Sequence, residues 1–315
     1  MSRRIRFHPP DSLVEVTCRT VQGRLLLQPT GRVADLCRGV LARAARLYPV
    51  RIHAFAFLGN HYHLLLTAAS AQRLAAFMNY LNSNLAREIG RVVDWREKFW
   101  GRRYQAILVS DEEAAQVERL VYLLRHGSKE NLVRSPADWP GASAIESLRT
   151  GAPIVGRWID RTGLSRANRR SERLDPRDFA SRERLELVPL PCWSHLPREA
   201  YRERIAGLVR EIERDSDRRI EETGREPLGR ARLERQHPHF APRRVRKSPA
   251  PLVHAASRAV REALRDSYRR FADAFRRASA ALRRHPRLAE VFDLFPAGSF
   301  PPPGPFIAGA LAIRS

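Results

Sequence analysis

Cysteines and long apolar runs are scarce in this 315-residue sequence. Cys18, Cys37 and Cys192 lie far apart and form neither a CxxC motif nor a disulfide framework. No apolar run approaches the roughly 18 residues of a membrane span, and the N-terminus lacks the apolar core of a signal peptide. The signatures G-x-x-x-x-G-K-[ST], H-E-x-x-H and G-x-S-x-G are also absent. We therefore expect a cytoplasmic protein with no membrane association.

Acidic residues are few compared with basic ones. The chain has 34 Asp and Glu against 57 Lys and Arg, a net charge of +23. The imbalance is present both up to Thr150, with 22 basic and 13 acidic residues, and beyond it, with 35 and 21. Such a balance fits a polyanionic partner, and the planar guanidinium of arginine suits phosphate, although an arginine-rich genome would give part of the excess. The apolar content of 43% is that of a globular protein.

The stretch Val50–Thr67, VRIHAFAFLGNHYHLLLT, predicts two β-strands joined by a tight turn at Gly59-Asn60. Side chains alternate along a strand, so His61 and His63 project from the same face of the second strand. Two imidazoles held in this way can bind one metal ion. We therefore predict a metal site on a sheet.

The H-x-H spacing is weak evidence by itself. Ten histidines in 315 residues give roughly 0.3 such pairs by chance. A second pair, His237 and His239, flanks Pro238, and the proline argues against an internal strand there. The alternative for His61 and His63 is a pair of ordinary half-buried histidines. The segments around the hairpin are therefore needed to distinguish a metal site from this alternative.

The elements around this hairpin predict an α+β domain. Strands are expected at Leu13–Arg19, with Arg24–Leu27 as an extension or hairpin partner, and at Arg103–Val109; helices are expected at Gly31–Tyr48, at Ser70–Gly90, and from a Ser110 cap to about His126-Gly127. This order is the split βαβ pattern of a ferredoxin-like sheet with helices on one face. We assign it to a first domain, residues 1–150.

The later half, residues 151–315, is predicted to be a basic and mainly helical region. Apolar residues recur at helical spacing in Pro197–Glu222 and in Ala255–Arg284, and arginines fill the other faces of the second helix. Ile154–Leu185 has too little periodicity for an assignment. The Pro-rich tail Phe295–Phe306 is expected to be extended.

The third predicted helix carries a candidate nucleophile. Tyr122 and His126 are four residues apart and therefore lie on one face, roughly 150° or more from the apolar stripe that contains Leu120 and Leu124. A tyrosine beside a metal-bound phosphate can attack it, whereas a free phenol with a pKa near 10 is a poor nucleophile. Tyr104 is a second candidate, although the first residue of a strand is expected to pack.

Four segments together resemble a known family. Asn60–Leu66 (NHYHLLL) resembles the HUH motif of single-tyrosine transposases, Phe99–Tyr104 (FWGRRY) their W-x-x-R-F/Y segment, Leu120–Leu124 (LVYLL) the segment with the nucleophile, and Trp139–Ser143 (WPGAS) the block after it. Their order and spacing agree across residues 12–147. The chain is thus similar to the REP-associated tyrosine transposase branch of the insertion-sequence HUH transposases.

The resemblance implies a metal-dependent endonuclease and strand transferase that acts on single-stranded or hairpin DNA. By position, Tyr122 is the implied nucleophile, and His61, His63 and His126 are the implied ligands of Mg²⁺ or Mn²⁺. The family usually has Gln or Asn where this chain has His126. Its members act as monomers, or as homodimers in which a partner subunit supplies the helix. The segment HGSKENLV, residues 126–133, lacks the Asn-Pro and Arg-Ala-Gly of the closest branch.

Four basic residues flank these elements: Arg102, Arg103, Arg125 and Lys129. We predict that they bind DNA phosphates; the alternative is solvated surface charge. Two other functions are alternatives to a transposase-like enzyme. A domesticated nucleic-acid-binding protein without catalysis would explain the charge, and a structural metal protein would explain the histidines.

Overall fold

The computed structural model describes residues 5–169, 174–242, 251–285 and 290–299. Its strands are β1 (Leu13–Arg19), β2 (Arg51–Phe57), β3 (His61–Thr67), β4 (Gln105–Val109), β5 (Ile154–Ile159), β6 (Ala180–Leu185) and β7 (Val253–His254). Its α-helices are α1 (Gly31–Leu47), α2 (Ala71–Val92), α3 (Glu113–Leu124), α4 (His126–Lys129), α5 (Ile145–Thr150), α6 (Arg161–Ala167), α7 (Arg198–Thr223), α8 (Arg230–Arg235), α9 (Arg258–Arg284) and α10 (Glu290–Asp293). Short 3-10 turns occur at Val21–Gly23, Pro136–Asp138, Pro176–Phe179 and Pro191–Trp193.

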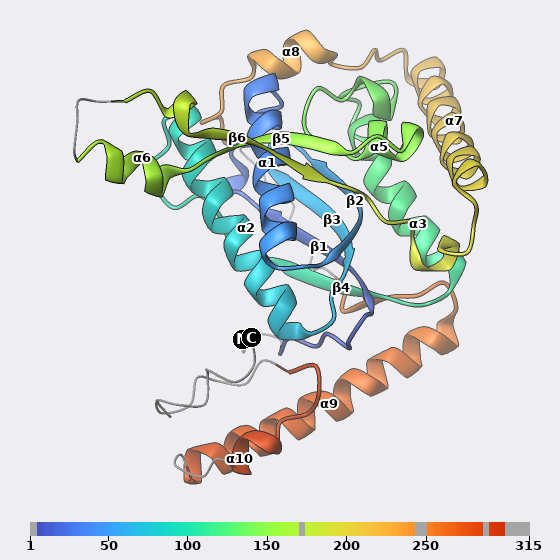
Figure 1. Cartoon of the computed structure of the whole chain (residues 1–315). Coiled ribbons are helices and arrows are strands. Elements are labelled where there is room, and N and C mark those ends of the chain that lie inside the picture. Colours follow the sequence, from blue (N-terminus) through green and yellow to red (C-terminus); the bar gives the residue numbers. More distant parts are fainter. Residues whose placement is uncertain (1–4, 170–173, 243–250, 286–289, 300–315) are drawn as a thin grey trace.

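The central sheet has the strand order β2-β3-β1-β4-β7 (Figure 1). The first four strands are antiparallel neighbours in the ferredoxin-like order, so the predicted α+β fold is confirmed. In the central pairing, Thr17 of β1 lies opposite both His63 of β3 and Gln105 of β4. Residues opposite one another share a face of the sheet, so this register fixes which side chains surround the histidines.

Helices α1 and α2 cover one face of this sheet (Figure 1). Each begins at the expected position, because the Thr30 hydroxyl accepts from Val33 N and the Ser70 hydroxyl accepts from Arg73 N. The Tyr62 hydroxyl donates to Asn82 Oδ1 of α2 at 2.6 Å. Tyr62 and Leu64 therefore face α2, and His61 and His63 face the opposite side of the sheet.

Helix α3 packs against that opposite side, where it contacts β2 and β3. The prediction that Ser110 caps it was wrong, because the N-cap is Glu112 and the Ser110 hydroxyl instead donates to the Glu112 carboxylate at 2.7 Å. The predicted single helix to Gly127 was also wrong. The helix ends at Leu124, and after Arg125 the short α4 begins with His126. His126, the first residue of α4, lies with its Nε2 3.2 Å from His61 Nε2 of β3.

The segment left unassigned in the sequence forms a hairpin, β5–β6, that lies across α1 (Figure 1). At the crossing, an added Cβ at Gly39 of α1 would lie 1.9 Å from Arg157 O, and one at Gly156 would lie 2.1 Å from Gly39 N. Two glycines therefore let a helix backbone touch a strand backbone. Buried Glu183 of β6 also accepts from Arg43 and Arg46 of α1, which ties the hairpin down.

Both β2 and β4 are partly covered by other segments of the chain. At the β2 edge, Phe57 N donates to Ala142 O and Ala144 N donates to Phe55 O, so the Trp139–Ser143 block extends the pairing. At the β4 edge, β7 from the later half pairs in parallel, with Val109 opposite His254. These contacts occupy part of each edge and leave less of it open to pairing with another chain.

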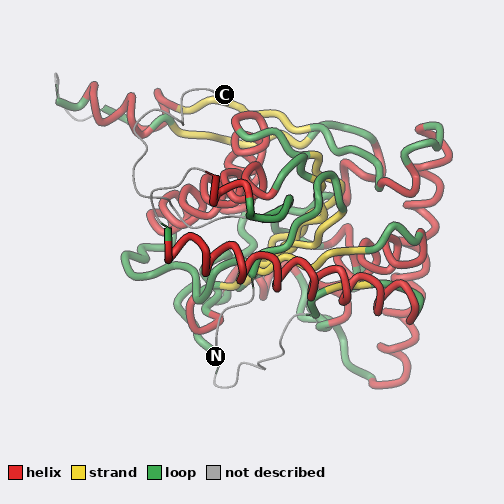
Figure 2. Tube along the Cα trace, turned by 90° about the horizontal axis from the view of Figure 1, so that it is seen from below, coloured by secondary structure: helices red, strands yellow, loops and turns green. Residues whose placement is uncertain are grey.

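The later half contributes to the same core as the first. The core cluster includes Ile154, Leu190, Trp193, Ile205 and Val253 as well as the residues of β1 to β4. The division into domains at residue 150 stays a prediction. Helices α7 and α9 begin close to the expected positions, and Figure 2 shows α9 crossing the lower side of the molecule.

Two further expectations concern irregular segments. The proposed strand at Arg24–Leu27 is wrong, because this segment follows a 3-10 turn at Val21–Gly23 and pairs with no strand. Of the Pro-rich tail, residues 300–306 lie outside the described part of the chain. None of the described helices is both long enough and apolar enough to cross a lipid bilayer.

Candidate metal and nucleophile site

The two histidines of β3 and the histidine that opens α4 come together on the face of the sheet opposite α2. His61 Nε2 lies 3.2 Å from His126 Nε2, and one ligand atom from each of His61, His63 and His126 lies within 4.8 Å of the others. Two nitrogens bound at about 2.2 Å to one ion at a right angle stand roughly 3 Å apart. The spacing therefore fits a shared cation.

Hydrogen bonds at the far side of each ring orient the two β3 histidines. His61 Nδ1 lies 2.7 Å from Asn60 Oδ1, and His63 Nδ1 lies 2.8 Å from Glu15 Oε1. Because both partners are acceptors, each imidazole carries its proton on Nδ1 and leaves the lone pair on Nε2. Buried His63 Nε2 has no hydrogen-bond partner among the described residues. Such an atom is suited to be a metal ligand.

Two of the three imidazoles, those of His61 and His126, resist protonation. Burial, followed by the neighbouring imidazoles, holds the pKa of His61 well below its ordinary value. Burial, with His63 and Lys129 nearby, lowers the pKa of His126 to about 3. Only neutral imidazole has the lone pair that a metal needs, so the lowered pKa values of these two histidines reduce competition from protons.

Tyr122 lies beside the three histidines and is half-buried. Its ring centroid is 5.6 Å from that of His63 and 5.5 Å from that of His126. All four groups belong to the same chain, so no partner subunit is needed to bring the tyrosine to the histidines. Tyr104 lies elsewhere: it precedes Gln105, which faces the His63 side, and it packs under the Arg6 guanidinium.

Glu15 and Arg119 connect these groups, and neither was singled out in the sequence. Buried Glu15 of β1 accepts from His63 through Oε1, and its Oε2 lies 2.6 Å from Arg119 NH2. The Arg119 guanidinium lies 4.2 Å from the centroid of the Tyr122 ring. A carboxylate inside the apolar strand LVEVTCR was the available signal for Glu15. No sequence signal marked Arg119.

The pKa of the Tyr122 phenol is raised, first by burial and then by the Glu15 carboxylate. Arg119 and Arg125 act in the opposite direction, because a cation favours the phenolate. The phenol therefore stays protonated at neutral pH unless additional positive charge arrives beside it.

The four predicted DNA-binding residues divide into two groups. Arg125 and Lys129 are exposed beside the site, with Lys129 Nζ 5.6 Å from the centroid of the Tyr122 ring. Arg102 and Arg103 are exposed just before β4, whose first residue Gln105 shares a row with Thr17 and His63. Arg19, which lies opposite His61 on β1 and is exposed, was missed. Alternation along β1 puts Arg19 on the same face as Glu15, and the register with β3 then places it opposite His61.

The second H-x-H pair does not take part in this site. His237 and His239 lie in a loop, where His239 Nε2 is 2.7 Å from Val93 O. Pro238 thus marks irregular backbone, as expected.

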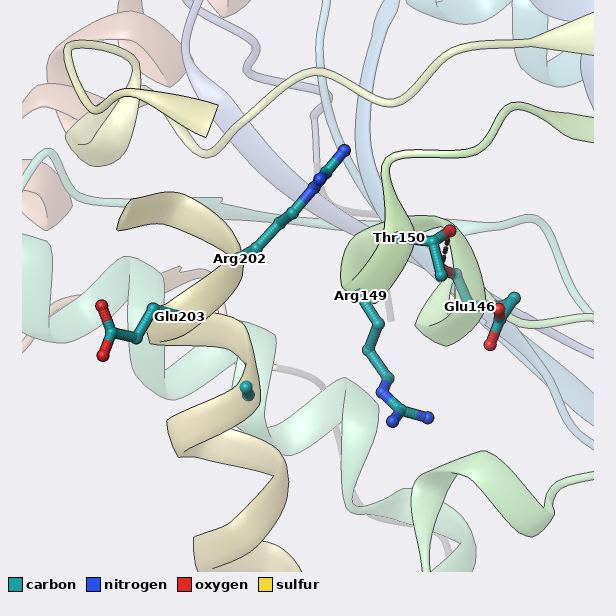
Figure 3. A pocket seen from close by; sticks show the side chains of 6 residues that line it. Glu146, Arg149, Thr150, Arg202 and Glu203 are labelled. Carbon is teal, nitrogen blue, oxygen red and sulfur yellow. Dashed lines mark hydrogen bonds between the residues drawn. The ribbon is translucent and has the colours of Figure 1, made fainter. Parts of the chain in front are cut away.

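A hollow of about 400 Å³ between α5 and α7 is a separate feature. Its lining includes Glu146, Arg149, Arg202 and Glu203, and Figure 3 shows the two arginines pointing in different directions. Two acids beside two diverging cations do not form a focused anion site.

A family model agrees with the motifs over part of the chain. Residues 26–122 match the family model "Transposase IS200 like". The chain is similar to the solved structure of a REP-associated tyrosine transposase bound to a REP hairpin, with 17% identity over 47% of this chain and 85% of that one and a TM-score of 0.40. It is also similar to a putative transposase from Deinococcus radiodurans R1, with 21% identity over 35% and 87% and a TM-score of 0.28. No curated protein matches the chain. Residues 26–122 of the chain are therefore similar to the IS200-like transposase family, as the sequence motifs predicted.

Proposed function

We propose that the protein is a metal-dependent endonuclease and strand transferase for single-stranded DNA, with Tyr122 as the nucleophile. The observation that carries this proposal is the meeting, within one chain, of Tyr122 with His61, His63 and His126. The distance from His61 Nε2 to His126 Nε2 supports binding of one cation between them. A monomer contains every group required, although a homodimer is compatible with the same chemistry.

The three histidines would hold a divalent cation, Mg²⁺ or Mn²⁺. Mg²⁺ prefers oxygen ligands, whereas Mn²⁺ accepts imidazole more readily. A histidine at the position where the family usually has Gln or Asn therefore favours Mn²⁺. When bound, the cation would polarise the scissile phosphate and offset the negative charge that develops on it.

The residues of the chain have the following roles. Tyr122 Oη attacks the phosphorus, the bond from phosphorus to the 3′ oxygen breaks, and the phenol proton ends on that oxygen. The products are a 5′-phosphotyrosine and a free 3′-hydroxyl, which later attacks the same linkage to rejoin or transfer the strand. The number of phosphodiester bonds is conserved, so no nucleotide hydrolysis is needed. Arg119, over the Tyr122 ring, stabilises the phenolate as it forms.

The basic residues around the site would hold the DNA. Arg125 and Lys129 lie beside Tyr122 and would bind phosphates next to the cleaved linkage, and Arg102 and Arg103 would bind the strand as it leaves across β4. A REP-like hairpin is the proposed DNA target, in line with the REP-associated branch that the motifs suggest. A cytoplasmic location, where such DNA is accessible, is part of this proposal.

The direct test is formation of a covalent adduct. The full-length protein is incubated with a hairpin-bearing single-stranded oligonucleotide labelled at its 3′ end and with Mn²⁺, Mg²⁺ or EDTA. A labelled band at the mass of protein plus DNA on a denaturing gel is expected with Mn²⁺ and not with EDTA. Tyr122→Phe should remove the band, and Tyr104→Phe should leave it. An adduct that persists in Tyr122→Phe would exclude this nucleophile.

One observation favours a second candidate, a domesticated DNA-binding protein without catalysis. Burial and Glu15 raise the pKa of Tyr122, which opposes formation of the phenolate. Binding of the hairpin with no adduct under any divalent metal would support this candidate over the enzyme.

A further inference from the structure

The positive charge of the later half is concentrated in one of its two long helices. Helix α9 has nine arginines and three acidic residues, a net charge of +6, whereas α7, of nearly equal length, has seven arginines and eight acidic residues, a net charge of −1. An arginine-rich genome would enrich both helices. The difference points to a specific role for α9.

Three arginines of α9 form a straight row that points away from the protein. Arg270, Arg277 and Arg284 are seven residues apart, about 10 Å along the axis, and successive members differ by only about 20° in direction. All three are exposed, and none has a hydrogen-bond or ion-pair partner among the described residues. The neighbouring Arg269 and Arg276 instead bind Asp266 and Asp273 on the same helix.

The apolar side of α9 is already occupied, which bears on the kind of partner. Phe271 packs on Phe7 with ring centroids 4.7 Å apart, and Phe275 packs on Phe295 at 5.1 Å. A basic amphipathic helix binds a membrane surface by inserting its apolar side, and this side is not free. The exposed side of α9 therefore presents charged side chains to a partner and no large apolar side chain.

The positions of the aromatic residues on α9 favour double-stranded DNA over single-stranded DNA as the partner of the arginine row. Proteins that bind single strands stack the bases on exposed aromatic rings. The aromatic residues of α9, Tyr268, Phe271 and Phe275, contact Phe7 or Phe295 on the inner side and are absent from the arginine row. A straight row of cations on a rigid helix fits the regular phosphates of a duplex.

The start of α9 is fixed to the sheet and to the helix that carries Tyr122. β7 pairs with β4, and the Glu112 carboxylate at the start of α3 accepts from Ala256 N at 2.9 Å and Ser257 N at 3.0 Å. His254 Nε2 also lies 3.1 Å from a carboxylate oxygen of Glu118 in α3. A duplex held by α9 would therefore have a defined position relative to Tyr122.

We propose that Arg270, Arg277 and Arg284 bind the phosphate backbone of double-stranded DNA, such as the stem of a hairpin. This inference rests on the proposed function only in taking DNA as the substrate. The row adds a duplex-binding surface outside residues 26–122, the part that matches the family model.

The test compares two triple variants of the full-length protein by fluorescence anisotropy across a salt series. The first is Arg270→Gln with Arg277→Gln and Arg284→Gln; the control is Arg198→Gln with Arg210→Gln and Arg214→Gln on α7, where the residues are also exposed and without a described partner. Both lose three charges. The DNA is a hairpin with a long stem or an unstructured single strand, and circular dichroism melting checks that both variants fold.

For the α9 variant on the hairpin, the slope of log K against log salt should fall by about three, with an affinity loss of about tenfold or more at 100 mM salt. Binding of the single strand, and binding by the α7 variant, should change less than about twofold. Equal losses in both variants, equal losses on both DNAs, or no loss would overturn the inference. So would an α9-dependent loss of binding to anionic lipid vesicles with unchanged hairpin binding.

The adduct assay with an unstructured strand tests the proposed chemistry separately. No adduct together with the expected hairpin result would reject the enzyme and retain the duplex surface. An adduct without the expected hairpin result would support the enzyme and reject the duplex-binding surface on α9.

Discussion

His63 Nδ1 donates a hydrogen bond to Glu15 Oε1 at 2.8 Å, from the middle of one strand to its neighbour. This contact fixes the imidazole so that Nε2 points at the candidate metal position. The same carboxylate pairs with Arg119 at 2.6 Å, and the Arg119 guanidinium covers the Tyr122 ring. One buried acid thus orients both a proposed metal ligand and the cation beside the proposed nucleophile.

Glu15→Gln should weaken metal binding by about 10- to 100-fold, because a carboxylate behind a ligating histidine increases the basicity of the ligand. The amide can still accept the hydrogen bond, so the loss comes from the missing charge. Isothermal titration with Mn²⁺ measures it. Glu118→Gln, an exposed acid on α3, is the matched control and should bind Mn²⁺ like the wild type. Unchanged affinity in Glu15→Gln would argue against this role.

Arg119→Gln should slow adduct formation by about 10- to 100-fold and change hairpin affinity by less than threefold, because the cation acts on the phenolate. Arg125→Gln provides the contrast, since an exposed residue that binds phosphate should mainly affect affinity. Single-turnover rates and anisotropy separate the two effects. A pure affinity loss in Arg119→Gln would mean that this residue only binds DNA.

Gly39→Ala should destabilise the fold by about 3 kcal/mol, because the new methyl group would overlap Arg157 O of the crossing strand. Gly207→Ala in α7 is the same change in a helix interior, with its nearest neighbour Arg210 NH2 4.0 Å away. It should stabilise the protein by roughly 0.5–1 kcal/mol. Urea unfolding measures both changes. Equal effects at the two sites would contradict the close crossing of α1 and β5.

Acid should destabilise the protein partly through His53. Its Nδ1 donates to Val188 O and Pro189 O, and burial lowers its pKa to about 4. Between pH 6.5 and 4 the unfolded chain therefore binds a proton that the folded chain does not, and stability falls as the pH falls. From pH 7 to pH 5, the wild type should lose about 2 kcal/mol more than His53→Gln in urea unfolding. Equal losses of stability in the wild type and in His53→Gln would show that folding does not lower the pKa of His53.

The sequence by itself determined the strand order of the first half and the position of the histidine pair. Alternation placed His61 and His63 on one face of β3, and helical periodicity located α1 and α2 within two residues of their ends. These features depend on local periodicity, which a single sequence displays directly. The motif order around Tyr122 was likewise readable, since it needs only spacing along the chain.

Tertiary structure alone decided the rest, because the contacts involved join residues far apart in the sequence. His126 of α4 meets His61 of β3, and Glu15 of β1 pairs with Arg119 of α3. The hairpin β5–β6 is too polar to show periodicity, and it is held by Gly39 and by the arginines around Glu183. Two residues of β7 are too few for any pattern, yet they attach the arginine row of α9 to the strand beside the site.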